Sequence, residues 1–465
     1  KRMKSATPKV LHPVCGRPSI WHVLRAAAGA RPATVAVVVA HGREAVEDAV
    51  RGFGMKPSPV FVDQGEPLGT GHAVAAAERA SAGADDVLVM SGDDPLVTAG
   101  HVRELLRVHR RTKAAATILT TDLDDPTGYG RVIREGGRLV EIAEESDASP
   151  TVRRIHEVAT LVYVFRREDL FKALPLVGRD NRQHEYYLHH VFPILREKGE
   201  TVSVVKADLG GALGLNSRAG LANVSRIMRR RIVEEHLRNG VTFVDPDTAY
   251  VDAGVRIGAD TVILPLTFLE GETRVGRACR VGPDTRLVDS VLDDDVDVTF
   301  AVVRGSRIRS GATVGPYASV RAGTVIEEGG KAGTFVELKQ TRVGRGSKVP
   351  HLSYVGDATI GDRVNVGAGS ITCNYDGYDK NRTVVGDDAF IGSDTMLVAP
   401  VRIGKNAWTG AGSVIAKDVP DGALAVERSE QRNVKGYDAR KRAAHGGRAP
   451  GGARIRATKR GGSSD

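Results

Sequence analysis

The 465-residue chain is 41% hydrophobic and 26% charged, a globular balance that excludes a wholly disordered or collagen-like protein. Its net charge of +9 would suggest nucleic-acid binding, but the segment from Arg440 onward holds eight Arg or Lys residues against one acid and so carries +7 of that charge. The rest of the chain is nearly neutral, so we expect no requirement for nucleic acid. The tail is expected to be disordered and solvated, with an RNA- or phosphate-binding arm as the alternative.

Neither a membrane span nor a disulfide framework is expected. The longest apolar run, Val35 to Ala40, is too short to cross a bilayer, and no secretory leader precedes it. The three cysteines, Cys15, Cys279 and Cys373, form no CxxC motif. A sparse, odd set of this kind is typical of a reducing compartment, which predicts a cytoplasmic protein without membrane contact.

The N-terminal part of the chain alternates helical and strand patterns. Helices are expected over 20–28, 43–50 and 70–80, and strands over 33–40, 59–62 and 85–90, the last leading into an acidic loop. This alternation predicts an α/β domain with a mostly parallel sheet and helices on both faces. Ligands of such sheets bind beyond the carboxyl ends of the strands. A further helix over 218–239, closed by Gly240, is expected to connect two domains.

From Val251 onward, small aliphatic residues recur every six positions. They form three runs: Val251, Ile257, Ile263, Leu269, Val275, Val281 and Leu287; then Val296, Val302, Ile308, Val314, Val320 and Ile326; then Val385, Ile391, Leu397 and Ile403. This period predicts a solenoid whose coils have three short flat sides, each with one aliphatic residue pointing inward. A glycine often follows the aliphatic residue, and we expect it to supply positive φ at the corners. The aromatic content of 5% suits a narrow core.

The repeat is interrupted over 372–384 by the sequence TCNYDGYDKNRTV. An insertion of this length must loop out from the coil. Loops held on a rigid scaffold are where functional residues concentrate, so chemistry is expected here.

The motifs of both halves together resemble one family. The solenoid contains HLSYVGD (351–357), NVGAG (365–369) and TCNYDG (372–377), and the N-terminal half contains RMKSATPKVLH, QGEPLGTGHA, SGDDPL, PTGYGR and GLNSR. Up to about Arg432 the chain resembles the bacterial bifunctional N-acetylglucosamine-1-phosphate uridyltransferases / glucosamine-1-phosphate N-acetyltransferases. The resemblance implies a Rossmann-like nucleotidyltransferase domain followed by a left-handed parallel β-helix, and a homotrimer with acetyl-transfer sites between subunits.

On this basis we divide the chain into a nucleotidyltransferase domain (1–217), a linker helix (218–240), a β-helix acetyltransferase domain (241–420) and a C-terminal segment with the basic tail (421–465). The implied function is synthesis of UDP-N-acetylglucosamine, a precursor of peptidoglycan and lipopolysaccharide. The small-molecule substrates would be acetyl-CoA, glucosamine-1-phosphate and UTP.

For acetyl transfer, the resemblance assigns His351 as the catalytic base, because a neutral imidazole can accept the proton of the sugar ammonium. A lone histidine is more often structural, but the surrounding polar motif favours the catalytic role. The implied glucosamine-phosphate ligands are Arg321, Lys339, Tyr354 and Asn365, of which the two cations would hold the phosphate. The implied acetyl-CoA contacts are Ala368, Asn374, Tyr375, Ser393, Ala411 and Arg428. Taken singly, each of these could instead be a solvated charge or a turn residue.

For uridyl transfer, the resemblance assigns the UTP and UDP-sugar positions to Arg2, Lys9, Gln64, Gly69, Thr70, Ser91, Gly92, Asp93, Gly130, Glu144 and Asn216. Asp93 and Asn216 match the pair that holds Mg²⁺ in the family, and carboxylate and amide oxygens are hard ligands of the kind this ion prefers. Asp93 alone would more often be a turn residue at the end of a strand. The family's Gly-rich loop LAAGxGTRM is represented only by Arg2 and Met3, so we expect the N-terminal domain to be incomplete.

Three departures from the family fall in this half. Ala159 replaces a sugar-contacting Asn, Leu161 replaces a Gly, and QHEYYLHH replaces QGEYYLTD, which introduces His184, His189 and His190. A large side chain at a glycine position would intrude on the sugar pocket or strain the backbone. The three histidines could form a metal site, but surface substitutions in a helix are the preferred interpretation. These departures leave an alternative function: an acetyltransferase with an impaired N-terminal domain and weak or lost uridyl transfer.

Overall fold

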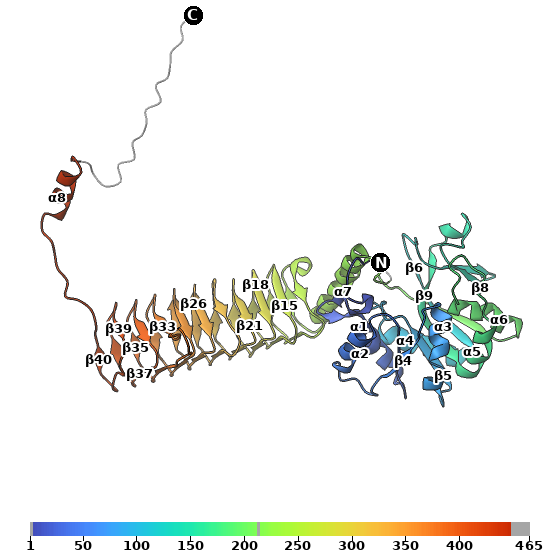
Figure 1. Cartoon of the computed structure of the whole chain (residues 1–465), viewed down its shortest axis with the longest axis horizontal. Coiled ribbons are helices and arrows are strands. Elements are labelled where there is room, and N and C mark those ends of the chain that lie inside the picture. The colour runs from blue at the N-terminus through green and yellow to red at the C-terminus, as the bar shows by residue number, and fades with distance from the viewer. Residues whose placement is uncertain (1–2, 212–213, 448–465) are drawn as a thin grey trace, which may run out of the picture.

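The computed structural model describes residues 3–211 and 214–447 (Figure 1). An α/β domain is followed by a long helix and then by a solenoid that extends away from the domain. Arg2, which was expected to contact phosphate, lies outside the described residues. None of the helices in these ranges combines the length and the apolar composition needed to cross a bilayer.

The N-terminal domain contains the six helices and strands expected between residues 20 and 90. Its helices are α1 (Ser19–Ala27), α2 (Arg43–Arg51), α3 (Thr70–Ala76), α4 (Ala99–Thr112), α5 (Arg167–Ala173) and α6 (Val191–Glu197). Its strands are β1 (Pro13–Val14), β2 (Arg17–Pro18), β3 (Ala36–Val39), β4 (Val60–Asp63), β5 (Asp86–Met90), β6 (Ala116–Asp122), β7 (Arg131–Glu135), β8 (Arg138–Ala143), β9 (Glu157–Arg166) and β10 (Val202–Lys206).

The main sheet of this domain is mixed, and the expectation of a mostly parallel sheet is corrected. The strand order is β10-β6-β9-β7-β8, and β5 also pairs with β9. β10 and β6 are parallel, whereas β9 runs antiparallel to β5, β6 and β7. The cause is β9 itself, which returns after the β7–β8 hairpin and pairs with both β5 and β6. Strands β3 and β4 form a separate parallel pair.

The long strand β9 is buried on both faces, so both faces of the sheet must be covered by other elements. Tyr163 and Phe165 pack with Phe192 of α6 in one apolar cluster. Val162 and Val164 point to the opposite face and join a second cluster. This alternation follows from the two-residue period of a strand. Each face of the sheet is therefore covered by its own apolar cluster.

Helix α7 (Arg218–Arg238) leads from this domain to the solenoid, as its apolar spacing predicted. The Ser217 hydroxyl caps it by accepting a hydrogen bond from Gly220 N (3.0 Å). A second contact comes from the β1–β2 hairpin, where Ala253 N of the first coil donates to Cys15 O (3.0 Å) and Arg17 pairs with Glu272. The domain is thus attached to the solenoid at two places.

The solenoid has three parallel sheets, one for each side of the coil. Side one runs from β11 (Thr242–Phe243) to β40 (Leu424–Ala425), side two from β12 (Tyr250–Val251) to β39 (Val414–Ile415), and side three from β13 (Arg256–Ile257) to β37 (Val401–Ile403). We call the bends from side one to two, two to three and three to one the first, second and third corners. Strands in register stack identical positions, so that Leu269 pairs with Leu287 and Leu287 with Val303.

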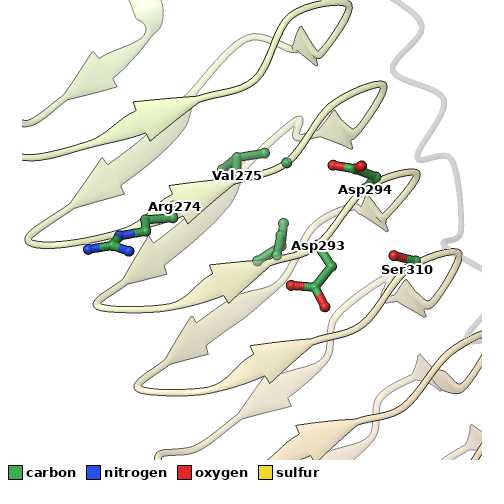
Figure 2. A pocket seen from close by; sticks show the side chains of 7 residues that line it. Arg274, Val275, Asp293, Asp294 and Ser310 are labelled. Atoms are coloured by element: carbon green, nitrogen blue, oxygen red, sulfur yellow. The ribbon is translucent and has the colours of Figure 1, made fainter.

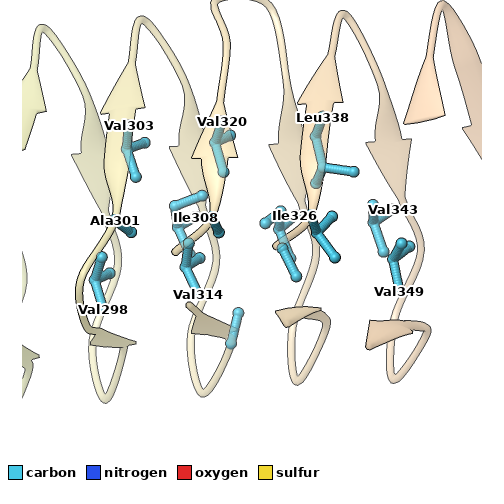
Figure 3. Close-up of a cluster of buried hydrophobic side chains, with 14 of the residues drawn as sticks. Val298, Ala301, Val303, Ile308, Val314, Val320, Ile326, Leu338, Val343 and Val349 are labelled. Carbon is cyan, nitrogen blue, oxygen red and sulfur yellow. The ribbon is translucent and has the colours of Figure 1, made fainter. Parts of the chain in front are cut away.

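The core consists of the inward aliphatic residues of each side (Figure 3). Among the described residues, Phe243 is the one aromatic ring in this cluster, which fits the low aromatic content. The expected phase is shifted at two positions. At the first, the register places Val298, and not the equally buried Val296, over Val281. At the second, Val302 is half-buried and its neighbour Val303 is fully buried, because the step from the buried Val298 to Val303 is five residues instead of six.

Of the glycines after the aliphatic residues, Gly282 (φ 104°) and Gly315 (φ 106°) supply positive φ as expected, and the others serve close packing. Gly361, Gly386 and Gly404 have ordinary φ, but a Cβ on Gly361 would lie 2.7 Å from the backbone N of Asp387 in the next coil. The corners instead use left-handed residues of other types, such as Leu352 (φ 51°) and Asp357 (φ 51°). The expectation of positive φ is therefore confirmed at Gly282 and Gly315 and corrected for glycines such as Gly361, Gly386 and Gly404.

The C-terminal segment is partly helical. Helix α8 (Tyr437–Ala444) includes Arg440, Lys441 and Arg442, and Arg442 Nε donates to Asp438 Oδ2 (2.7 Å). An exposed helix with an internal i,i+4 ion pair accounts for this order. The expectation of a disordered tail is corrected for these residues, and its part from 448 onward lies outside the described residues.

The side-by-side residues Val302 and Val303 provide a test of the phase. Val303→Ala is expected to lower the free energy of unfolding by about 2 kcal/mol, since it removes two buried carbons and leaves a cavity. Val302→Ala is the matched control and is expected to cost less than about 1 kcal/mol. Denaturant unfolding monitored by circular dichroism would measure both. An equal loss in the two variants would contradict the inward placement of Val303.

Candidate active sites

In the N-terminal domain, the ammonium of Lys9 links the two residues expected to hold a metal. Lys9 Nζ contacts Asp93 Oδ2 and donates to Asn216 Oδ1 (2.7 Å). Lys9 begins a short 3₁₀ turn, Asp93 follows β5, and Asn216 precedes α7. Ser91 Oγ also donates to Asp93 Oδ1. Four of the predicted residues, far apart in the sequence, are therefore brought together.

Asp94 belongs to this cluster, although only the first acid of SGDDPL was singled out in the sequence. The side chain of Asp94 is buried, and burial, followed by the charge of Asp93, raises its pKa well above the usual range. Gly214 of the GLNSR motif has φ +53°, and a Cβ there would lie 3.2 Å from Asp94 Oδ1 and 3.6 Å from Asn216 Nδ2. The motif glycine is thus required for the acidic pair and the amide to approach each other.

The predicted uracil residues Gln64, Gly69 and Thr70 also lie together, against the segment Tyr186–Leu188. Gln64 Nε2 donates to Gly69 O (3.1 Å), and Thr70 Oγ1 accepts from Leu188 N (2.9 Å). A Cβ on Gly69 would lie 2.6 Å from Tyr186 O. The loop can therefore pack against the backbone of Tyr186 only because residue 69 has no side chain.

The predicted sugar residues Gly130 and Glu144 are neighbours, since a Cβ on Gly130 would lie 3.3 Å from Glu144 Oε1. Burial, followed by the charges of Asp147 and Glu185, raises the pKa of Glu144 to about 6. His189 Nδ1 lies 3.7 Å from Glu144 Oε1. A residue that departs from the family therefore touches a predicted sugar position.

The departures are placed differently from what was expected. His189 is buried in a 3₁₀ turn and stacks on Tyr187 (ring centroids 5.3 Å apart), so the interpretation as a surface substitution in a helix is wrong for it. His184 is exposed with φ +54°, which is the backbone strain expected at a glycine position, without intrusion into the pocket. Among the described residues no cluster of three His, Cys, Asp or Glu side chains is arranged for a metal.

Two further departures lie directly beside predicted site residues. Ala159 N donates to Gly130 O (2.8 Å), and Leu161 O accepts from Ser91 N (3.1 Å). Both are positions on β9, whose backbone thus supports the sugar and phosphate segments. The amide lost at Ala159 would have been next to Gly130, and a lost hydrogen bond of this kind costs about 0.5–1.5 kcal/mol.

On side two of the solenoid, Lys339, Tyr354 and Asn374 meet around one carboxylate, Asp357. Lys339 Nζ pairs with Asp357 Oδ2 (2.9 Å), and Asn374 Nδ2 donates to the same carboxylate and lies 3.4 Å from the Tyr354 hydroxyl. Burial by itself would raise the pKa of Asp357, but the hydrogen bonds from Lys339 and Asn374 outweigh it and lower that pKa. Asp357 was quoted within HLSYVGD but not singled out.

Arg321 extends this row of cations along side two. Arg321 Nη1 pairs with Glu337 Oε1 (3.1 Å), and Glu337 is in register with Tyr354 on the next coil. Its side chain remains half-exposed, whereas that of Lys339 is 17% exposed. Arg321 directly follows β24 (Ser319–Val320) and Lys339 ends the next strand of side two, β27 (Glu337–Lys339), so both cations lie at the second-corner end of side two.

His351 lies at the first corner, at the opposite end of side two. It ends β29 (Lys348–His351), is exposed on the outside of the coil and precedes the left-handed Leu352. Asn365 lies on side one, in register with Lys348 on the coil after β29. Within a single chain the structure thus brings Lys339, Tyr354 and Asn374 together but places His351 and Asn365 apart from them.

Four of the predicted acetyl-CoA residues form a column along the first corner that starts at His351: Ala368, Ser393, Ala411 and Arg428. Asn374 and Tyr375 instead follow β33 (Ile371–Cys373), at the second corner. Backbone hydrogen bonds connect each coil to the next: Gly369 N to His351 O (3.3 Å), Asp394 N to Ala368 O (2.7 Å) and Gly412 N to Ser393 O (2.8 Å). Arg428 Nη1 then donates to Ala411 O (3.0 Å). Tyr375 lies in the looped-out insertion, where Lys380 Nζ is 4.2 Å from its ring centroid. The column gives an extended ligand an uninterrupted edge of the solenoid.

Two surface hollows lie elsewhere. One of about 380 Å³, on side three, is lined by Arg274, Val275, Asp293, Asp294 and Ser310 and contains none of the predicted residues (Figure 2). The other, of about 660 Å³, lies in the N-terminal domain and is lined by Ile142, His189, His190 and Arg196 among others. It borders the predicted sugar positions through His189.

Comparison with known proteins identifies the family. Residues 1–195 match the model of the MobA-like NTP transferase domain, and residues 382–417 match that of the hexapeptide repeat of succinyl-transferase. Proteins named "Bifunctional protein GlmU" are 47% identical in Caldanaerobacter subterraneus and 45% identical in Carboxydothermus hydrogenoformans, covering 94% of this chain and 95% and 97% of theirs. The chain belongs to the GlmU family. The family predicted from the motifs is confirmed, as is the solenoid as a hexapeptide left-handed β-helix.

Both halves that the GlmU family combines are present in this chain. The nucleotidyltransferase fold keeps the Lys9–Asp93–Asn216 cluster, and the β-helix keeps the column from His351 to Arg428. A relative from Listeria monocytogenes with the same name is 45% identical over 94% of this chain and 95% of its own. The bifunctional interpretation is therefore favoured over that of an acetyltransferase with an impaired N-terminal domain.

The Asp357 cluster predicts a stability difference between two ion pairs. Asp357→Asn is expected to cost about 2–3 kcal/mol, because Lys339 and Asn374 lose the charge of a buried partner. Asp388→Asn is the matched control: Asp388 also has a left-handed φ but pairs with Arg363 on the surface, so its loss should cost less than about 1 kcal/mol. Denaturant unfolding would compare them. Equal losses would show that the Asp357 cluster is not stabilising.

The burial of His189 predicts a pH dependence. Burial, followed by the charge of His190, lowers the pKa of His189 from 6.5 to about 3. The unfolded chain then binds more protons, so the stabilising contribution is complete above pH 6.5 and is lost as the pH falls toward 3. Between pH 7 and pH 5 the wild type should lose about 2 kcal/mol more than His189→Thr.

Calorimetric unfolding at the two pH values would measure this difference. His184→Thr is the control, because His184 is exposed and its replacement should leave the pH dependence of the wild type intact. If His189→Thr and the wild type show the same pH dependence, His189 is not held neutral in the folded domain.

Proposed function

We propose that this chain makes UDP-N-acetylglucosamine in two reactions. The β-helix transfers an acetyl group from acetyl-CoA to glucosamine-1-phosphate, and the N-terminal domain then transfers UMP from UTP to the product. The observation that carries this proposal is the presence, in one chain, of the Lys9–Asp93–Asn216 cluster and the column from His351 to Arg428. Family membership supports the pairing of the two activities.

In the first reaction the sugar amine attacks the thioester carbonyl and the thiolate of CoA leaves. His351 would take the proton from the attacking nitrogen, since its imidazole is exposed at the first corner. Arg321 and Lys339 would hold the phosphate, and Tyr354 and Asn365 the sugar. Ala368, Ser393, Ala411 and Arg428 would contact acetyl-CoA along the column, and Asn374 and Tyr375 would contact it from the insertion at the second corner. Asp357 fixes the position of the Lys339 ammonium.

In the second reaction the phosphate oxygen of the sugar attacks the α-phosphorus of UTP and pyrophosphate leaves. Lys9 would contact the phosphates, with Gln64, Gly69 and Thr70 at the uracil and Gly130 and Glu144 at the sugar. Asp93 and Asn216 fit a Mg²⁺ ion because both already share one cation, Lys9. When bound, this ion supplies neutralising charge to the triphosphate.

A homotrimer is part of the proposal. Within one chain His351 and the cations lie at opposite ends of side two, so a neighbouring copy would be needed to complete the acetyl-transfer site. Exposed apolar side chains support a subunit contact at the first corner, where Phe300, Tyr317 and Phe335 stack and Leu352 follows. Sedimentation velocity would measure the assembly.

We propose the cytoplasm as the location, which the unpaired state of all three cysteines supports. We also propose the division into domains over 1–217, 218–240, 241–420 and 421–465. The position of α7 and the start of the solenoid at β11 support the second and third of these segments.

The two half-reactions can be separated by single substitutions. His351→Ala is expected to lower acetyl transfer about 10²- to 10⁴-fold, because the amine loses its proton acceptor, and to leave uridyl transfer unchanged. Asp93→Asn is expected to do the reverse. Product formation from acetyl-CoA with glucosamine-1-phosphate, and from UTP with N-acetylglucosamine-1-phosphate, would be measured separately. Each variant is the folding control of the other, and a wild-type acetyl-transfer rate in His351→Ala would refute the base assignment.

A further inference from the structure

The oxygens that fit a metal are already occupied by partners from the chain itself. Asp93 Oδ2 contacts the Lys9 ammonium, which also donates to Asn216 Oδ1 (2.7 Å). The other oxygen, Asp93 Oδ1, accepts from Ser91 Oγ. In this arrangement one positive charge from the chain neutralises the carboxylate and occupies the space between the two ligands.

A divalent ion and this ammonium cannot share those oxygens. Both would lie against Asp93 Oδ2 and Asn216 Oδ1, and like charges at such a separation repel strongly in a partly buried site. The side chain of Asp93 is 14% exposed, so water screens the repulsion little.

The Lys9 side chain can leave without a change in the fold. Its side chain is 36% exposed, and it carries a flexible four-carbon stem. The backbone next to it is held by the hydrogen bond from Leu11 N to Pro8 O (2.9 Å), and the side chain of Val10 packs closely against Gly92. Movement would therefore be confined to the ammonium and its stem.

We propose that Lys9 is an internal cation that keeps the metal site closed until the phosphates of a nucleoside triphosphate draw its ammonium away. The divalent ion is then admitted together with the nucleotide and not before it. This inference rests on the proposed uridyl transfer for the identity of the nucleotide. The closure itself follows from the contacts of Lys9, Asp93 and Asn216.

The test is a titration of the full chain with Mn²⁺ alone, without nucleotide, followed by calorimetry and by the loss of the free-ion electron spin resonance signal. The wild type is expected to bind no Mn²⁺ at Asp93 and Asn216 in this titration. Lys9→Met is expected to bind the ion there, with an affinity higher than that of the wild type by roughly tenfold or more. Lys206→Met is the matched control, since Lys206 pairs with Asp122 elsewhere in the same domain. It should behave as the wild type.

A double variant locates the gained site. Lys9→Met combined with Asp93→Asn should lose the Mn²⁺ binding that Lys9→Met gains. If Lys9→Met fails to fold, as judged by its thermal unfolding, Lys9→Gln takes its place in the same titration. Tight binding of Mn²⁺ by the wild type, or no gain in the folded Lys9 variant, would overturn the inference.

The proposed function is tested independently of this result. Formation of UDP-N-acetylglucosamine by the wild type reports on uridyl transfer, whereas the Mn²⁺ titration contains no substrate. If the wild type is inactive in uridyl transfer but the Lys9→Met variant gains Mn²⁺ binding, the inference that Lys9 closes the metal site stands and the proposed uridyl transfer is refuted.

Discussion

The parallel ladder between coils is the constraint on which the solenoid and its site depend. Each backbone hydrogen bond fixes the next coil at the strand spacing of about 4.8 Å, so a given position in one coil lies directly over the same position in the next. Inward positions must then be small and aliphatic in every coil, and positions facing a neighbouring coil closely must lack a Cβ, as at Gly361. Outward positions are free to vary, and stacking turns scattered residues into continuous columns.

In both halves the cations that would meet phosphate are already held by carboxylates. Lys339 is held by Asp357, and Lys9 by Asp93. Such pairing lets an ammonium remain partly buried in the absence of ligand and keeps it in place for one. The partners differ in what else they touch. Asp357 is fixed further by Asn374, whereas Asp93 belongs to a set of oxygens suited to a second cation.

Much of the architecture could be predicted from the sequence because it depends on local period. The six-residue repeat predicted the three-sided solenoid, and the apolar spacing over 218–239 predicted α7. The mixed sheet could not be predicted in this way, because the pairing of β9 with β5 and β6 depends on contacts distant in sequence. The prediction that Val302 points inward was wrong for a related reason. The number of residues in a coil varies, and this variation is seen only in the strand register, which pairs Leu287 with Val303.

The candidate site residues were predicted one by one from motifs. The side chains of this chain that hold them in place were not predicted. Asp94 and Asp357 lie inside the motifs SGDDPL and HLSYVGD. Each is an acid close in sequence to a predicted site residue, and this could have indicated that they belong to the sites. The burial of His189 could not be predicted from its motif, because the end of QHEYYLHH, Leu188–His190, forms a 3₁₀ turn rather than part of a surface helix. Burial depends on what packs above a segment, which a motif does not contain.

The straight solenoid separates the proposed acetyl-transfer site from the N-terminal domain (Figure 1). Six strand pairings separate β11, beside the N-terminal domain, from β29, which ends at His351, and at about 4.8 Å each they amount to about 29 Å. The coils between are filled with aliphatic side chains and offer no tunnel (Figure 3). Under the proposed function, an acetylated sugar phosphate made at the first corner would pass through bulk solvent before it is uridylylated. The cell's own pool of that intermediate would mix freely with it.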